Sequence, residues 1–94
     1  LTRVEKAERL LRTWGFSQFR VRDHDGLARI EVAPAELDAA LDREFARAAR
    51  EHLTDAGFDH VTLDLHGYRT GSVSPEGDSA GPDLEQEYPV REDR

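Results

Sequence analysis

The sequence predicts an α/β fold, more narrowly a two-layer α+β arrangement in the order α-β-β-α-β, with a three-stranded mixed sheet and two helices on one face. Apolar residues recur at helical spacing over residues 3–14 and 35–56, which predicts two amphipathic helices. Apolar and polar residues alternate over residues 18–24, 27–33 and 59–66, which predicts three strands. The last three elements form a strand–helix–strand unit, whose crossover is right-handed if its two strands are parallel.

The first predicted helix has an apolar stripe and a signal at each end. Thr2 is a candidate N-cap, and Glu5 three residues later completes a capping-box pattern. Gly15 fits the position just past the end of the helix. The stripe that we expect to face the core consists of Val4, Ala7, Leu10, Leu11 and Trp14.

Asp25 and Gly26 predict a two-residue hairpin turn, because a type I′ turn needs positive φ at both of its central residues. The turn also determines which residues lie opposite each other. The expected core-face pairs are Phe19–Val32, Val21–Ile30 and Asp23–Ala28, and the expected outer-face pairs are Arg20–Glu31, Arg22–Arg29 and His24–Leu27. We expect Arg20–Glu31 to be an ion pair, whereas Arg22 opposite Arg29 is a like-charge pair that needs neutralising.

The second predicted helix follows Pro34 and ends at Gly57. Its expected buried stripe consists of Leu37, Leu41, Phe45, Ala48, Ala49, His52, Leu53 and Ala56. The third strand is expected to direct Val61, Leu63 and Leu65 to one face, opposite His60, Thr62, Asp64 and His66. Either strand of the hairpin could be its partner.

We expect residues 1–69 to form one domain and residues 70–94 to be a disordered acidic tail. The tail holds all but one of the prolines, several Gly and Ser residues and many acids. Such a segment cannot bury enough apolar surface to offset the entropy of ordering it.

Composition excludes several classes of function. The 94 residues carry 13 Lys+Arg against 20 Asp+Glu, a net charge of −7, so we expect no nucleic-acid partner. No apolar run suits a membrane helix and no signal peptide is visible, so we expect no membrane partner and a cytoplasmic location. Cysteine is absent, which excludes a cysteine nucleophile within these residues. All basic residues but Lys6 are arginine, which fits a halophilic protein as well as a GC-rich genome.

The outer face of the predicted sheet gathers arginines in an acidic chain. The members that we expect to bear on ligand binding are Arg20, Arg22, Arg29 and Glu31 from the hairpin, with Thr62, Asp64 and His66 from the third strand. Guanidinium groups suit bidentate binding of phosphate or carboxylate, so this face is a candidate anion site; the alternative is a solvated face with weak ion pairs. His60 and His66 flank Asp64 and could form a metal site, although isolated surface histidines are far commoner. No phosphate-binding loop and no nucleophile motif occurs.

Several segments together resemble a known family. These segments are residues 6–11, 14–16, 19–24, 28–32, 57–58, 61–65 and 67–72, and the most specific part of the chain reads RVRDH at 20–24, LARIEV at 27–32 and LDLHGYRTGS at 63–72. In these segments, residues 2–73 resemble the C-terminal domain of the LarE family. The members of that family are ATP-dependent sacrificial sulfur transferases of the PP-loop, or adenine nucleotide α-hydrolase, superfamily.

The resemblance implies an activity for the whole protein rather than for this chain. Such enzymes adenylate a carboxylate of a pyridinium dicarboxylate mononucleotide with ATP and Mg²⁺, and then insert sulfur from a cysteine or by way of an iron–sulfur cluster. The product leads to the nickel-pincer cofactor of lactate racemase. The PP-loop motif and the cysteine are missing here, so this fragment alone is not expected to be active, and ATP, Mg²⁺ and any cluster would be bound mainly by an N-terminal domain.

The resemblance also implies roles for particular residues. Arg20 and Arg22 match the family's arginine pair, which would hold the phosphate or carboxylate of the mononucleotide substrate, with Arg29 and Asp64 in support. Glu8 and Glu31 match acids that are associated with a metal site, and Asp38 is the nearest candidate for a third. The resemblance further implies a homo-oligomer. The alternative function is a non-catalytic module for anion binding or oligomerisation.

Overall fold

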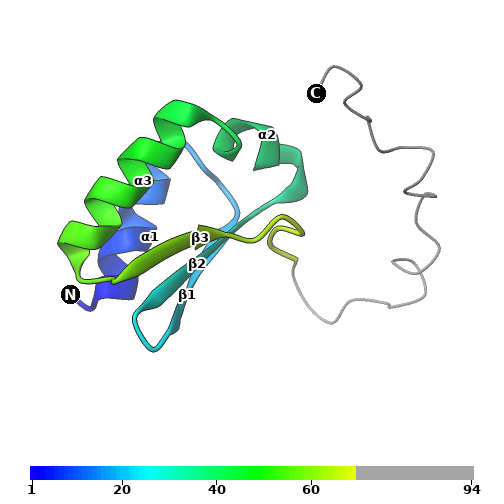
Figure 1. Ribbon diagram of the computed structural model, residues 1–94. Coiled ribbons are helices and arrows are strands. Elements are labelled where there is room, and N and C mark those ends of the chain that lie inside the picture. Colours follow the sequence, from blue (N-terminus) through cyan, green and yellow to red (C-terminus); the bar gives the residue numbers. More distant parts are fainter. Residues whose placement is uncertain (70–94) are drawn as a thin grey trace, which may run out of the picture.

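The computed structural model describes residues 1–69, which form two layers (Figure 1). The sheet has three strands in the order β1-β2-β3, with β1 antiparallel and β3 parallel to β2. The elements are α1 (Arg3–Thr13), β1 (Phe19–His24), β2 (Leu27–Val32), the 3-10 helix η1 (Pro34–Glu36), α2 (Leu37–Ala40), α3 (Arg43–Ala56) and β3 (His60–Leu63). The predicted α/β class and the mixed sheet are confirmed, and the partner of the third strand is β2.

The core lies between the sheet and the two long helices. In Figure 1, α1 and α3 run side by side along one face of the sheet. Leu11 from α1, Ile30 and Val32 from β2, and Leu53 from α3 are almost completely buried there, together with Phe58 in the loop before β3. Because the helices cover only this face, the alternate side chains of the strands point to the opposite, outer face.

The ends of α1 are as predicted. The Thr2 hydroxyl accepts a hydrogen bond from the Glu5 backbone N–H at 3.1 Å, and the Glu5 carboxylate accepts one from the Thr2 N–H at 2.9 Å. These two bonds satisfy backbone donors that the helix itself leaves unpaired. Gly15 follows the helix with a φ of 103°, which glycine adopts without strain.

The hairpin register is confirmed at every position. All six pairs from Phe19↔Val32 to His24↔Leu27 lie opposite each other as expected. Asp25 and Gly26 have φ values of 55° and 97°, the positive values that a type I′ turn requires. The turn therefore determines which residues of β1 and β2 share the outer face.

The prediction of one continuous helix over residues 35–56 is wrong. The chain forms η1 and α2, then breaks at Leu41 and Asp42 before α3 begins. Asp42 has extended dihedrals (φ −144°, ψ 141°), and its carboxylate accepts a hydrogen bond from the Phe45 N–H at 3.1 Å. Asp42 is thus the N-cap of a new helix, and its side chain stabilises the break because it satisfies a donor at the start of α3.

Two residues of the expected buried stripe lie elsewhere. Leu41 is 55% exposed because it belongs to the break between the helices. His52 is also exposed, with its ring in edge contact with Trp14 at a centroid distance of 5.7 Å. Ala49 and Leu53 of the same stripe are buried as predicted.

The third strand is shorter than the predicted range of residues 59–66. It ends at Leu63, and Leu65 is 65% exposed instead of facing the core. Gly67, with a φ of 84°, then returns the chain to the end of β2, where the Tyr68 N–H donates to the Val32 carbonyl oxygen at 2.6 Å. The predicted tail, residues 70–94, lies outside the described residues. Within residues 1–69, no helix combines the length and the apolar character needed to cross a membrane.

Candidate functional site

The candidate anion site occupies the outer face of the sheet. Arg20 and Arg22 come from β1 and alternate with buried Val21, while Arg29 and Glu31 come from β2 and alternate with buried Ile30. Asp64 follows β3 directly, and its backbone N–H donates to the Ile30 carbonyl oxygen at 2.8 Å. The sheet therefore brings together side chains that are distant in the sequence, as predicted from the turn and the alternation. We call this set the arginine face: Arg20, Arg22, Arg29, Glu31 and Asp64.

Glu31 lies at the centre of the arginine face and is only 6% exposed. Its carboxylate accepts hydrogen bonds from Arg29, at 3.0 Å from Nε, with the terminal nitrogen Nη2 at 2.9 Å. Nε of Arg22 lies 3.4 Å from both carboxylate oxygens. The two opposed guanidinium groups therefore share one buried negative charge. This contact supplies the neutralisation that the Arg22–Arg29 pair needs.

The ion pair expected between Arg20 and Glu31 is not among the contacts of the described residues. Arg20 instead lies over the ring of Tyr68, with the guanidinium carbon 5.4 Å from the ring centroid. One terminal nitrogen is also 3.5 Å from the Tyr68 hydroxyl. Sequence reasoning missed Tyr68 as a member of this site, although an aromatic residue beside an arginine cluster is a signal for such a contact.

Charge on the arginine face is close to balanced but remains positive. Three guanidinium groups oppose two carboxylates, and Arg29 lies 3.6 Å from Asp64 as well as against Glu31. The side chains of Arg22 and Arg29 are 42% and 40% exposed, so both can be reached from solvent. An acidic chain thus presents a small, accessible, positively charged area that suits an anionic ligand.

Glu8 has a structural partner at the edge of the sheet. Its carboxylate accepts a hydrogen bond from the Val21 N–H at 3.0 Å. Because β1 is an edge strand, this donor would otherwise lack a strand partner, and a carboxylate from α1 satisfies it. The sequence pattern did not reveal this role, since it depends on how α1 lies against β1.

The three acids predicted to bind a metal do not form one ligand set in the described domain. Glu8 lies at the β1 edge, Glu31 between two arginines, and Asp38 in the first turn of α2. Within residues 1–69, no group of three or more His, Cys, Asp or Glu side chains is arranged to hold a metal ion. The metal assignment therefore stays a prediction, and it would need ligands from outside these residues.

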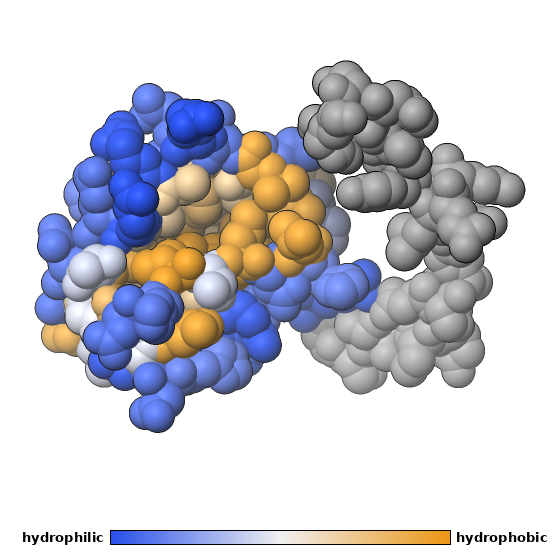
Figure 2. All heavy atoms as spheres, viewed as in Figure 1, coloured by the Kyte–Doolittle hydropathy of each residue, from blue (hydrophilic) through white to orange (hydrophobic). Residues whose placement is uncertain are grey.

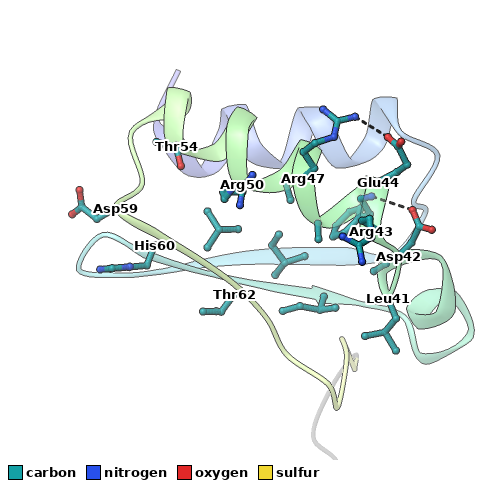
Figure 3. A pocket seen from close by; sticks show the side chains of 17 residues that line it. Leu41, Asp42, Arg43, Glu44, Arg47, Arg50, Thr54, Asp59, His60 and Thr62 are labelled. Carbon is teal, nitrogen blue, oxygen red and sulfur yellow. Dashed lines mark hydrogen bonds and ion pairs between the residues drawn. The ribbon is translucent and has the colours of Figure 1, made fainter.

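The described domain also has a hollow on the helix side of β3, away from the arginine face. It has a volume of about 1030 Å³ and is open to solvent between α3 and β3 (Figure 3). Figure 2 shows the apolar surface that gathers in this region. The apolar lining includes Ile30, Phe45, Ala49, Val61 and Leu63. Arg43, Arg47 and Arg50 of α3 line it as well. Sequence analysis did not predict this groove, because its existence depends on β3 being the unpaired outer strand.

Comparison with known proteins connects this domain to an enzyme. No family model matches the chain. A 74-residue stretch, 79% of the chain, is 39% identical to the pyridinium-3,5-bisthiocarboxylic acid mononucleotide synthase of Lactiplantibacillus plantarum. The chain belongs to the LarE family. An uncharacterized protein of Synechocystis is 38% identical over the same number of residues.

Both relatives are much longer than this chain. The matched stretch covers 26% of the Lactiplantibacillus synthase and 28% of the Synechocystis protein. The chain therefore spans about a quarter of the length of these curated relatives.

Proposed function

We propose that residues 1–69 form the substrate-binding C-terminal domain of a LarE-type sulfur transferase. In this proposal Arg20, Arg22 and Arg29 bind an anionic group, phosphate or carboxylate, of a pyridinium dicarboxylate mononucleotide. The observation that carries the proposal is the arginine face itself, three guanidinium groups on one sheet surface of a chain with a net charge of −7.

The chemistry of the ligand class matches this surface. A mononucleotide with two acidic ring substituents offers a phosphate and carboxylate groups, and each can accept two parallel hydrogen bonds from one guanidinium group. Arginine keeps its charge at every physiological pH, so the face stays cationic. The name of the Lactiplantibacillus synthase contains the same class of molecule, a pyridinium mononucleotide with two acidic groups.

The proposed role of the domain is to bind and orient the substrate. The chain contains no cysteine to supply sulfur. We propose that adenylation by ATP and Mg²⁺, and the sulfur source, whether a sacrificial cysteine or an iron–sulfur cluster, belong to the part of the protein that this chain does not include.

Sulfur transfer by the complete protein tests the proposal. Arg20→Ala and Arg22→Ala should each abolish transfer. The thermal unfolding temperature should change little in Arg20→Ala, because that side chain is exposed and has no contact with Glu31 among the described residues. Arg47→Ala is the matched control, since it removes the same charge from the far side of the domain. Wild-type activity in both arginine-face variants would refute the proposal.

A second candidate function is an oligomerisation module, and the groove between α3 and β3 favours it. An apolar lining, an unpaired strand edge and the 55% exposed Leu41 together form a surface that a second copy of the domain could cover. Size-exclusion chromatography with light scattering distinguishes the two functions. A stable oligomer that binds no anion would favour the module, whereas anion binding would favour the substrate-binding domain.

A further inference from the structure

We propose that Glu31 is the positioning residue of the arginine face. Its carboxylate holds Arg22 and Arg29 from beneath, so that their remaining nitrogens point together at one anion. The inference rests on the proposed function, because it assumes that the face binds an anion. It adds a role that the resemblance does not imply, since the family match suggests a metal ligand at this position.

The hairpin register creates the need for such a residue. Arg22 and Arg29 lie directly opposite each other. Two like charges in this arrangement repel each other, and long side chains would separate into solvent if nothing held them. Glu31 is two residues from Arg29 on the same strand, so its side chain lies on the same face and within reach of both guanidinium groups.

The particular nitrogens that Glu31 engages support a positioning role. It contacts Nε of Arg22, and Nε and one terminal nitrogen of Arg29. Within residues 1–69, the two terminal nitrogens of Arg22 and the second terminal nitrogen of Arg29 have no hydrogen-bond partner. Those nitrogens are the donors that remain available to a ligand, and both arginine side chains are partly exposed.

Burial separates Glu31 from the ligand and makes it a support. With 6% of its surface exposed, it offers little direct contact to an incoming molecule. A carboxylate at this depth requires charged partners, because an unpaired buried charge is strongly unfavourable. A cation that approached Glu31 would have to displace two guanidinium groups. The same contacts that favour anion binding above Glu31 thus disfavour a metal ion on it.

Calorimetric titration with nicotinic acid mononucleotide, a pyridinium carboxylate mononucleotide, tests the inference on the 94-residue chain. We expect Glu31→Gln to weaken binding at least tenfold, and Glu31→Ala to weaken it further, because glutamine keeps one acceptor oxygen. Glu51→Gln is the matched control: it changes the net charge equally and breaks a pair on α3, so binding should stay within about twofold of wild type.

The outcomes separate the inference from the function on which it rests. If the wild-type chain and its control bind the probe but Glu31→Gln binds as tightly or more tightly, Glu31 competes with the ligand and the inference is overturned. If wild type itself binds neither this probe nor inorganic phosphate, the proposed function fails first and the inference falls with it.

A measurement on the unmodified protein covers the case in which Glu31 variants do not fold. In a nitrogen-15 NMR titration, we expect the Nε–H signals of Arg22 and Arg29 to be protected from exchange with water, both without ligand and at saturation. The terminal-nitrogen signals of Arg22 should shift as the probe is added. Loss of Nε–H protection on binding would mean that the anion displaces Glu31, and would contradict the positioning role.

Discussion

Arg22 on β1 and Arg29 on β2 lie directly opposite each other, and their guanidinium groups converge on the buried carboxylate of Glu31. A cross-strand pair that would be unfavourable in isolation is thereby converted into a pre-organised cationic surface. Preorganisation matters for binding, because side chains that are already ordered lose less entropy when a ligand arrives. The arginine face is therefore the feature of this domain best suited to holding a charged substrate.

Tyr68 should contribute to ligand binding through Arg20. Tyr68→Ala removes the ring beneath the guanidinium group, so we expect the mononucleotide probe to bind about three- to tenfold more weakly. Tyr68→Phe keeps the ring and loses only the 3.5 Å contact to the hydroxyl, so its affinity should stay near wild type. Titration calorimetry on the two variants checks this, and equal affinities for Ala and Phe would exclude a role for the ring.

Gly67 is expected to be essential for the loop that places Tyr68 beside Arg20. A Cβ at this position would lie 2.5 Å from the Val32 carbonyl oxygen, and the φ of 84° is unfavourable for other residues. We expect Gly67→Ala to lower the free energy of unfolding by about 1–3 kcal/mol. Gly15→Ala is a useful comparison, since it has a similar φ of 103° but no atom within 4 Å of the added Cβ, and it should cost less in a urea titration. Equal losses would argue against the close contact with β2.

The cap at Asp42 should stabilise α3 measurably. Asp42→Ala removes the acceptor for the Phe45 N–H and is expected to cost about 1 kcal/mol of unfolding free energy. Asp42→Asn keeps an acceptor oxygen and should cost much less. Chemical denaturation followed by circular dichroism measures both. Identical stability of wild type and the alanine variant would mean that the break between α2 and α3 does not depend on this cap.

Acid should weaken the ion pair between Arg3 of α1 and Asp23 of β1. The Arg3 guanidinium, 2.6 Å away, and the Gly26 N–H hold the pKa of Asp23 below its ordinary value of 3.8. Because the folded pKa is the lower one, the stabilisation is present above about pH 4 and is lost as pH falls through the folded pKa. Asp23→Asn should therefore be less stable than wild type at pH 7, and the difference should shrink toward pH 2.5. A difference that is constant over this range would contradict the assignment.

Features of this domain that depend on neighbouring residues in the sequence could be predicted, and features that depend on detailed geometry could not. The hairpin register and the membership of the outer face depend on a local turn and on strand alternation, so both could be predicted. The division of residues 34–56 could not, because Leu41 and Asp42 continue the helical spacing and only the cap geometry of Asp42 reveals the break.

The partners within the site were harder to predict than its membership. The register places Arg20 opposite Glu31. A long arginine side chain can reach several neighbours, however, and the Glu31 carboxylate contacts Arg22 and Arg29 instead. Tyr68 reaches Arg20 only because the chain turns back at Gly67 after β3. The contact of Glu8 with Val21 likewise depends on the packing of α1 at the sheet edge. All of these contacts depend on tertiary packing, and no periodic pattern in the sequence indicates them.

Binding of nicotinic acid mononucleotide to wild type, Arg22→Ala and Arg47→Ala tests the central claim most directly. The two substitutions remove the same charge, one from the arginine face and one from α3. We predict that wild type and Arg47→Ala bind with affinities within about twofold, and that Arg22→Ala binds at least tenfold more weakly, the effect expected for losing a charged hydrogen-bond donor. Equal weakening by both substitutions would show that only net charge matters and would contradict a site on the arginine face.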